Sequence, residues 1–262
     1  MTRCDHPRHQ LALTQAFLLY DRRMRKIFVM MSIVSVIATL TYSIWIFLAK
    51  PESISIPGIN DTNSVRYVAI GDSYTVGQGV AAREAWPSQV VEIAKANGVP
   101  LKLVSTIARS GWTTTNLIEQ GLAEYDATNA QFVTLMIGAN DANQNLTPDR
   151  FQTNLNLILD KIAQQVPPEK TVVVTIPNFF VTPAGALRAT GENPEAETRE
   201  LNSIIQNECA QRGIAVVDLF ETSRNLGSNP SLLARDKLHP SAAGHLQWAS
   251  VIAPTVLQVF GK

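Results

Sequence analysis

The stretch Tyr67-Val68-Ala69-Ile70-Gly71-Asp72-Ser73-Tyr74-Thr75-Val76-Gly77 decides the fold of this chain. Its first half is a continuous apolar run, which is typical of a strand buried on both faces of a parallel sheet. Its second half is a turn flanked by glycines, with a serine at the tip. A nucleophilic hydroxyl needs such a rigid, exposed place, with its own backbone N–H free to bind an oxyanion. The stretch therefore predicts a strand over 67–70 that leads to a candidate nucleophile, Ser73.

Four more apolar runs follow and alternate with helical patterns. This order predicts one α/β domain over residues 65–262, whose parallel strands deliver loops from their carboxyl ends to a common edge. Open sheets of this kind keep their sites at that edge. The other strands are expected at 101–105, 132–137, 171–176 and 215–219, and the helices at 86–96, 114–121, 148–165, 196–211 and after Pro240.

A second motif, Asp236-Lys237-Leu238-His239-Pro240, lies near the C-terminus. An imidazole activates a serine only when a carboxylate holds its other nitrogen in the correct tautomer, and an Asp three residues before the His can do so within one turn. Pro240 disfavours helical backbone at His239, which indicates a loop that leads into a helix. His245, in that helix, is expected to be a packing or surface residue and not a second base.

Two glycine-containing loops follow the second and third expected strands. Gly111 lies in the first of them, and a glycine there lets a backbone N–H approach a substrate closely. Asn140 lies in the second, and its carboxamide is a neutral N–H donor for an oxyanion. Trp112 and Phe179 are candidates for lining a substrate pocket.

Taken together, these blocks resemble the SGNH, or GDSL-like, serine hydrolase family of esterases and lipases. The four family blocks fall in order, with Ser73 in Gly-Asp-Ser, Gly111, Asn140 in Gly-Ala-Asn-Asp, and His239 before a proline. The resemblance covers about residues 65–258. It implies a three-layer α/β/α, flavodoxin-like fold with a five-stranded parallel sheet, hydrolysis of ester bonds, no cofactor and no metal.

The resemblance also implies roles for single residues. By this match Ser73 is the nucleophile, and Asp236 and His239 complete a catalytic triad. The N–H groups of Ser73 and Gly111 and the Asn140 side chain form the oxyanion hole. The expected substrate is a small-molecule, lipid or carbohydrate ester. Two alternatives stay open at this point: an O-acyltransferase that acts on envelope carbohydrate, and a tethered binding module without activity.

The N-terminal part of the chain has a different character. Residues 27–49 contain no charge, and a helix of 23 residues spans roughly 34 Å, enough for a bilayer core. Four basic residues within 22–26 precede this segment, so the positive-inside bias predicts a cytoplasmic segment over 1–26 and a catalytic domain outside the membrane. Residues 50–64 are expected to form a linker. We expect a single-pass anchor; secretion after signal cleavage and a true start at Met24 are the alternatives.

Composition excludes other classes of protein. Removing residues 1–50, with seven Lys and Arg against two Asp, leaves 15 basic and 20 acidic residues, which argues against a nucleic-acid-binding face. Cys4 and Cys209 are the two cysteines, and they form neither a disulfide framework nor a zinc-binding spacing.

Overall fold

The computed structural model describes residues 64–262. The expected cytoplasmic segment 1–26, the membrane segment 27–49 and nearly all of the linker 50–64 therefore lie outside the described residues. Within 64–262, each helix is too short or too polar to cross a bilayer.

The sheet confirms the predicted architecture. It has five strands, all parallel, in the order β2-β1-β3-β4-β5. The chain order reverses between β1 and β3, and such a switch point is where open α/β sheets bind ligands. The strands are β1 (Val65–Gly71), β2 (Leu101–Ala108), β3 (Phe132–Met136), β4 (Thr171–Val174) and β5 (Ala215–Val217).

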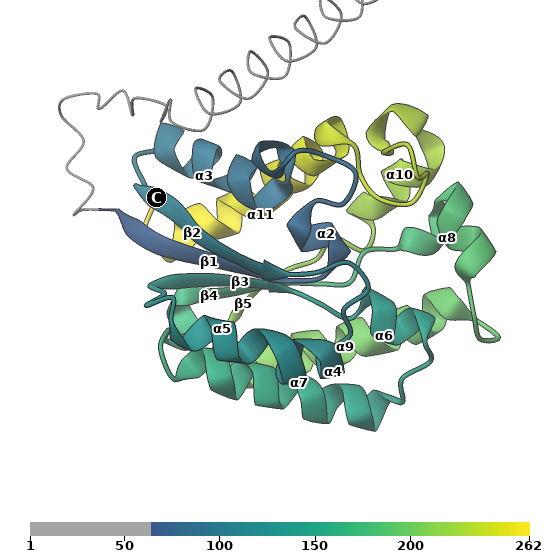
Figure 1. Ribbon diagram of the computed structural model, residues 1–262, viewed down its shortest axis with the longest axis horizontal. Coiled ribbons are helices and arrows are strands. Elements are labelled where there is room, and N and C mark those ends of the chain that lie inside the picture. Colours follow the sequence, from purple (N-terminus) through teal and green to yellow (C-terminus); the bar gives the residue numbers. More distant parts are fainter. Residues whose placement is uncertain (1–63) are drawn as a thin grey trace, which may run out of the picture. The chain divides into compact units, whose positions relative to one another are not determined.

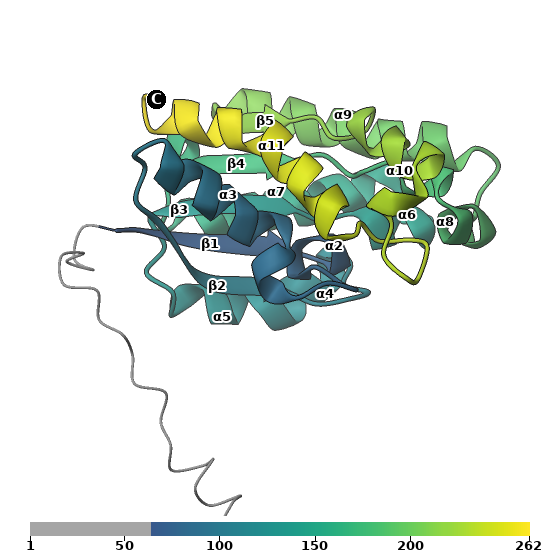
Figure 2. The same ribbon diagram turned by 90° about the horizontal axis from the view of Figure 1, so that it is seen from above.

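Helices cover both faces of this sheet and make the three layers (Figures 1 and 2). Helices α3 (Trp86–Ala96) and α11 (Ala242–Val259) lie on one face, where the fully buried Trp86 and Trp248 fill the core. The other face carries α5 (Leu122–Asp126), α7 (Pro148–Ala163) and α9 (Pro194–Arg212).

Burial separates the central strands from the edge strands. Every residue of β3 and β4 is buried, as the continuous apolar runs predict, and so is β1 from Tyr67 onward. The expectation of burial on both faces is wrong for β2, where Lys102 and Thr106 are exposed. As a strand at the edge of the sheet, β2 leaves part of its surface to solvent.

Two strands end earlier than the sequence predicts. β4 and β5 were expected to reach residues 176 and 219, but they stop at Val174 and Val217. For β4 the reason is a side chain of α9, because Asn202 accepts a hydrogen bond from the Ile176 N–H at 2.8 Å and donates to the Ile176 carbonyl at 3.0 Å. After β5, the Leu219 N–H donates to the Thr175 hydroxyl at 2.9 Å and not to a backbone carbonyl. The backbone therefore leaves the β-ladder and becomes a loop at the carboxyl edge.

The long helices agree with the prediction within a few residues, while the short elements were not predicted. The expected helix 114–121 is a composite of α4 (Thr114–Asn116), a π-helical turn η3 (Leu117–Gly121) and α5. Short helical segments without a long amphipathic pattern occupy the loops at the carboxyl edge. They are α2 (Ser73–Val76), α6 (Ala139–Asn143), η5 (Phe179–Val181), α8 (Pro183–Arg188), η6 (Thr222–Arg224), α10 (Asn225–Ser228) and η7 (Pro230–Leu232); η2 (Ala82–Glu84) precedes α3 and η4 (Pro168–Lys170) precedes β4.

Candidate active site

Ser73 is the first residue of helix α2, directly after strand β1. Asp72 caps this helix, because its buried carboxylate accepts a hydrogen bond from the Tyr74 N–H at 2.9 Å. The preceding Gly71 is required for packing, since a Cβ there would lie 2.2 Å from the Met136 carbonyl oxygen. These contacts fix the serine at the carboxyl end of β1, beside the central strand β3.

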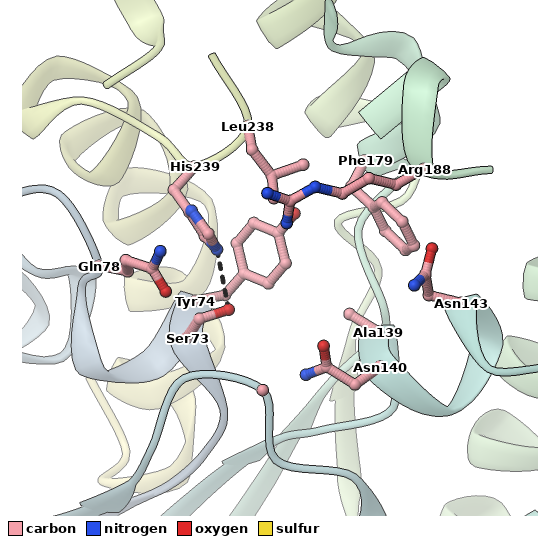
Figure 3. A pocket seen from close by; sticks show the side chains of 11 residues that line it. Ser73, Tyr74, Gln78, Ala139, Asn140, Asn143, Phe179, Arg188, Leu238 and His239 are labelled. Atoms are coloured by element: carbon pink, nitrogen blue, oxygen red, sulfur yellow. Dashed lines mark hydrogen bonds between the residues drawn. The ribbon is translucent and has the colours of Figure 1, made fainter. Parts of the chain in front are cut away.

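His239 and Asp236 meet Ser73 in a chain of hydrogen bonds. His239 Nε2 lies 2.9 Å from Ser73 Oγ, and His239 Nδ1 lies 2.6 Å from Asp236 Oδ2 (Figure 3 shows the first contact). The other oxygen, Asp236 Oδ1, accepts the N–H groups of Leu238 and His239 at 3.0 Å each. One carboxylate therefore both shapes the loop and orients the imidazole.

The protonation states of this pair suit proton transfer. Burial lowers the pKa of His239 below its ordinary value, although the hydrogen bond and charge of Asp236 act in the opposite direction. For Asp236, burial raises the pKa, but the hydrogen bonds from His239 and from two backbone N–H groups outweigh it, and the net shift is downward. Near neutral pH the imidazole is neutral and the carboxylate is charged, so Nε2 can accept the Ser73 proton.

The loop that carries His239 is held from both sides. The Ala234 N–H donates to the His239 carbonyl at 2.8 Å, and Lys237 adopts a left-handed φ of 56° to make the turn. The sequence suggested Pro240 as the residue that opens the following helix. The structure shows that Ser241 is the cap, since its side chain accepts from the Gly244 N–H and α11 begins at Ala242.

Gly111 and Asn140 line the same pocket as His239, and Asn140 lies across this pocket from His239 (Figure 3). Gly111 has φ +84°, and no atom lies within 4 Å of the position that a Cβ would occupy, so its backbone faces open space. Asn140 Nδ2 donates one hydrogen bond to the Trp112 carbonyl at 2.9 Å, which orients the carboxamide and leaves its second N–H available. Within the described residues, the Ser73 and Gly111 N–H groups have no acceptor.

A buried carboxylate joins the two loops that carry Gly111 and Asn140. Asp141 accepts the Thr114 N–H at 3.0 and 3.1 Å and also the Thr114 hydroxyl. Asn154 of α7 donates to that hydroxyl at 2.9 Å. Burial raises the pKa of Asp141, and the hydrogen bonds from Thr114 oppose the rise. Asp141 therefore fixes the loop after β2 as well as its own.

A cavity of about 110 Å³ opens over these groups. Phe179 lines it, as the sequence suggested, but the Trp112 side chain does not. Trp112 is 5% exposed and packs against Gly121, with the Arg109 guanidinium 5.2 Å from its ring, so only its carbonyl serves the site. The lining residues are Ser73, Tyr74, Gln78, Gly111, Ala139, Asn140, Asn143, Phe179, Arg188, Leu238 and His239 (Figure 3).

Several residues that line the pocket belong to no sequence motif, so the sequence did not predict them. Tyr74 follows Ser73, and its ring lies 5.0 Å from the His239 ring and 5.6 Å from Trp248, between the site and the core. Arg188 comes from α8, a short helix that the apolar pattern did not predict. Only the folded chain brings that helix to the pocket.

Two further titratable residues, His245 and Cys209, are buried in the core. His245 is fully buried and accepts the Trp86 N–H on Nδ1 at 3.3 Å; burial lowers its pKa to about 4, as suits a packing residue. Cys209 is buried in α9, and burial raises the pKa of its thiol to about 12. Within residues 64–262, His, Cys, Asp and Glu side chains form no group of three that could hold a metal ion.

This geometry is that of a serine hydroxyl prepared to attack a carbonyl carbon. The sequence model of the GDSL-like lipase/acylhydrolase family matches residues 69–246, well over half of the chain. The chain therefore belongs to this family and is a hydrolase of ester bonds. The resemblance on which the sequence analysis relied is thus confirmed. A search of curated proteins returned no match.

Solved structures share the fold. The psychrotrophic esterase EstA from Pseudoalteromonas sp. has a TM-score of 0.59 at 16% identity, over 75% of this chain and 99% of that chain. A lipase/acylhydrolase from Enterococcus faecalis has a TM-score of 0.54 at 24% identity, over 73% and 95%. The acetylxylan esterase Axe2 from Geobacillus stearothermophilus has a TM-score of 0.56 at 18% identity, over 73% and 94%.

Proposed function

We propose that this protein hydrolyses carboxylic esters by acyl transfer through Ser73, with His239 as general base and Asp236 as the group that orients it. One observation carries the proposal. The hydrogen bonds from Asp236 to His239 and from His239 to Ser73, at 2.6 and 2.9 Å, form an unbroken path at the carboxyl edge of the sheet.

In the first step, Ser73 Oγ attacks the ester carbonyl carbon while His239 Nε2 takes the hydroxyl proton. The carbonyl oxygen becomes an oxyanion that the Ser73 and Gly111 N–H groups and the Asn140 carboxamide can stabilise. The bond between the carbonyl carbon and the alcohol oxygen then breaks. His239 returns the proton to that oxygen, the alcohol leaves, and the acyl group stays on Ser73.

In the second step, His239 takes a proton from water and the hydroxide attacks the acyl-serine. The same donors stabilise the second oxyanion. The bond to Ser73 Oγ breaks, His239 protonates this oxygen, and the carboxylic acid leaves. A sugar hydroxyl in place of water would give transfer instead, so product analysis with and without a carbohydrate acceptor separates hydrolase from transferase.

The size of the cavity favours small acyl groups. Its volume of about 110 Å³ is below the roughly 300–1,000 Å³ of pockets that enclose drug-sized ligands. An acetyl group fits such a space, and a long acyl chain does not fit inside it. We therefore expect kcat/KM to fall as the acyl part of p-nitrophenyl esters lengthens from acetyl to octanoyl.

The direct test is Ser73→Ala with p-nitrophenyl acetate as substrate. We expect kcat to fall by about 10⁶-fold, the order seen when the nucleophile of a serine protease is removed. Ser203→Ala is the matched control, because Ser203 is an exposed serine of α9 whose hydroxyl donates to the Arg199 carbonyl within the same helix. A fluorophosphonate probe should label the protein and the control, but not Ser73→Ala. Full hydrolysis by Ser73→Ala would refute the proposal, and absence of labelling would favour the non-catalytic module.

We further propose that residues 27–49 anchor the domain at the outer face of a membrane. The support is the uncharged run of 23 residues and the basic residues before it. The full chain should sediment with membranes and resist extraction at high salt. The size of the mature protein separates an uncleaved anchor from a cleaved signal, because cleavage releases a shorter soluble chain.

A further inference from the structure

Arg188 is a cation without a partner among residues 64–262. Within the described residues its guanidinium makes neither an ion pair nor a hydrogen bond, whereas Arg109, Arg199 and Arg212 are each paired with a carboxylate. An unpaired arginine on a solvated surface is ordinary. Arg188 differs because it comes from α8 and lines the cavity over Ser73.

The pocket contains no charge that could balance this guanidinium. The other lining residues are neutral amides, apolar and aromatic side chains, Ser73 and an imidazole that is neutral near pH 7. No carboxylate lines this cavity in the part of the chain that the structure describes. Asp236 lies behind His239 and is already bound to it. The pocket is therefore positive on the side of Arg188.

Arg188 lies on the His239 side of the pocket. In Figure 3 its guanidinium extends over the Tyr74 ring towards Leu238, away from Asn140. Its charge acts on both His239 and Tyr74, which places it near both rings. The Tyr74 hydroxyl is buried and has no hydrogen-bond partner among residues 64–262, so it is a second polar group at the same place.

The mechanism assigns this side to the alcohol part of the ester. His239 must protonate the departing alcohol oxygen, so the alcohol lies beside His239, while the carbonyl oxygen points to Gly111 and Asn140. A group attached to the alcohol therefore extends towards Arg188. A guanidinium offers several N–H donors in a planar fork that matches a carboxylate or a phosphate.

We propose that Arg188 binds an anionic group on the alcohol part of the substrate, so that the substrate class is short-acyl esters of alcohols that bear a carboxylate or a phosphate. This inference rests on the function proposed above. Arg188 acts as a specificity residue in ground-state binding and takes no part in proton transfer. Its contribution is therefore expected mainly in KM.

The test uses two matched ester pairs that share an acetyl group. The carboxylate pair is 3-acetoxybenzoate and its neutral methyl ester, and the phosphate pair is 1-acetylglycerol 3-phosphate and neutral 1-acetylglycerol. For each pair, the ratio of kcat/KM for the anionic ester to that for the neutral ester is measured. The pair with the larger ratio identifies the preferred anion.

In the wild type we expect a preference for at least one anionic ester that weakens with added salt. Arg188→Gln should lower the ratio by roughly 10- to 100-fold, as expected for loss of a charge-assisted hydrogen bond. Arg188→Lys keeps the charge but not the fork and should retain part of the preference. Arg150→Gln is the matched control, because Arg150 is also exposed and unpaired within the described residues but does not line the pocket.

A wild-type enzyme that cleaves these esters without charge preference overturns the inference and leaves the proposed function intact. An anionic preference that Arg188→Gln retains also overturns it. If the wild type cleaves none of the four esters and no p-nitrophenyl ester, the proposed function fails and this inference fails with it.

Discussion

Replacement of Asp236 by Asn tests the site most sharply, because the two oxygens of this side chain have separate tasks. Oδ1 accepts the N–H groups of Leu238 and His239 at 3.0 Å each, and an amide oxygen can keep these bonds. Oδ2 lies 2.6 Å from His239 Nδ1, where Asn instead presents an NH₂ group. The loop is preserved, and only the imidazole contact changes.

The expected effect follows from the tautomer of His239. Facing an N–H donor, Nδ1 becomes the acceptor and the proton moves to Nε2, which then cannot accept the Ser73 proton. In a serine protease the same exchange lowers kcat about 10⁴-fold. At 1.36 kcal/mol for each factor of ten, this amounts to about 5.5 kcal/mol of transition-state stabilisation. The carboxylate is one third exposed, so water competes for His239 and sets this figure as the upper end.

The assay is kcat and KM with p-nitrophenyl acetate, together with urea unfolding. Asp218→Asn is the matched control, because Asp218 Oδ1 accepts the N–H two residues ahead, of Phe220, just as Asp236 Oδ1 accepts that of Leu238. Asp218 does not line the pocket. We expect unchanged kinetics in the control and a lower kcat with little change in KM in Asp236→Asn. A kcat within tenfold of wild type in a folded Asp236→Asn protein would refute the assigned role.

Three other predictions follow from the geometry and the pKa shifts. Asn140→Ala removes the proposed oxyanion donor and should lower kcat about 10²- to 10³-fold in steady-state assays, with a smaller cost in stability from the lost bond to the Trp112 carbonyl. Because burial lowers the pKa of His239 below its ordinary value of 6.5, the midpoint of the fall of kcat/KM with acidification should lie below pH 6.5 in a pH–rate profile; Arg188→Gln should move this midpoint upward, since the guanidinium disfavours the imidazolium. Burial gives His245 a pKa of about 4 in the folded protein, against about 6.5 in the unfolded chain, so between these values the folded state binds fewer protons and loses stability as the pH falls. The free energy of unfolding of His245→Gln minus that of the wild type should therefore increase by about 3 kcal/mol from pH 7 to pH 4. A difference that stays constant over this range would contradict the prediction.

The site residues that the sequence predicted are brought together either by the topology of the sheet or by proximity in sequence. Ser73, Gly111 and Asn140 directly follow strands β1, β2 and β3, and parallel strands bring their carboxyl ends to the same edge. His239 is fixed to Asp236 by proximity in sequence. Local pattern and topology together therefore predicted that these residues would meet, although each motif alone is weak.

The errors of the sequence analysis have a different origin. Trp112 was a candidate for lining the pocket, but its side chain packs against Gly121 and does not line it. The strand end near 176 depends on the amide of Asn202, and the one near 219 depends on the hydroxyl of Thr175; both are residues of other segments. In each case the outcome depends on a side chain from elsewhere in the chain, which no local pattern records.

By itself, the sequence determined the α/β class, the parallel sheet, the family and the residues that approach Ser73. It could do so because buried strands require continuous apolar runs and because such strands align their loops at one edge. Only the tertiary structure decided the small volume of the cavity and the place of Arg188 in the lining of the same pocket as His239. These features arise from short helices without an amphipathic pattern, whose positions depend on packing against the rest of the fold as well as on local caps such as Thr182 at α8.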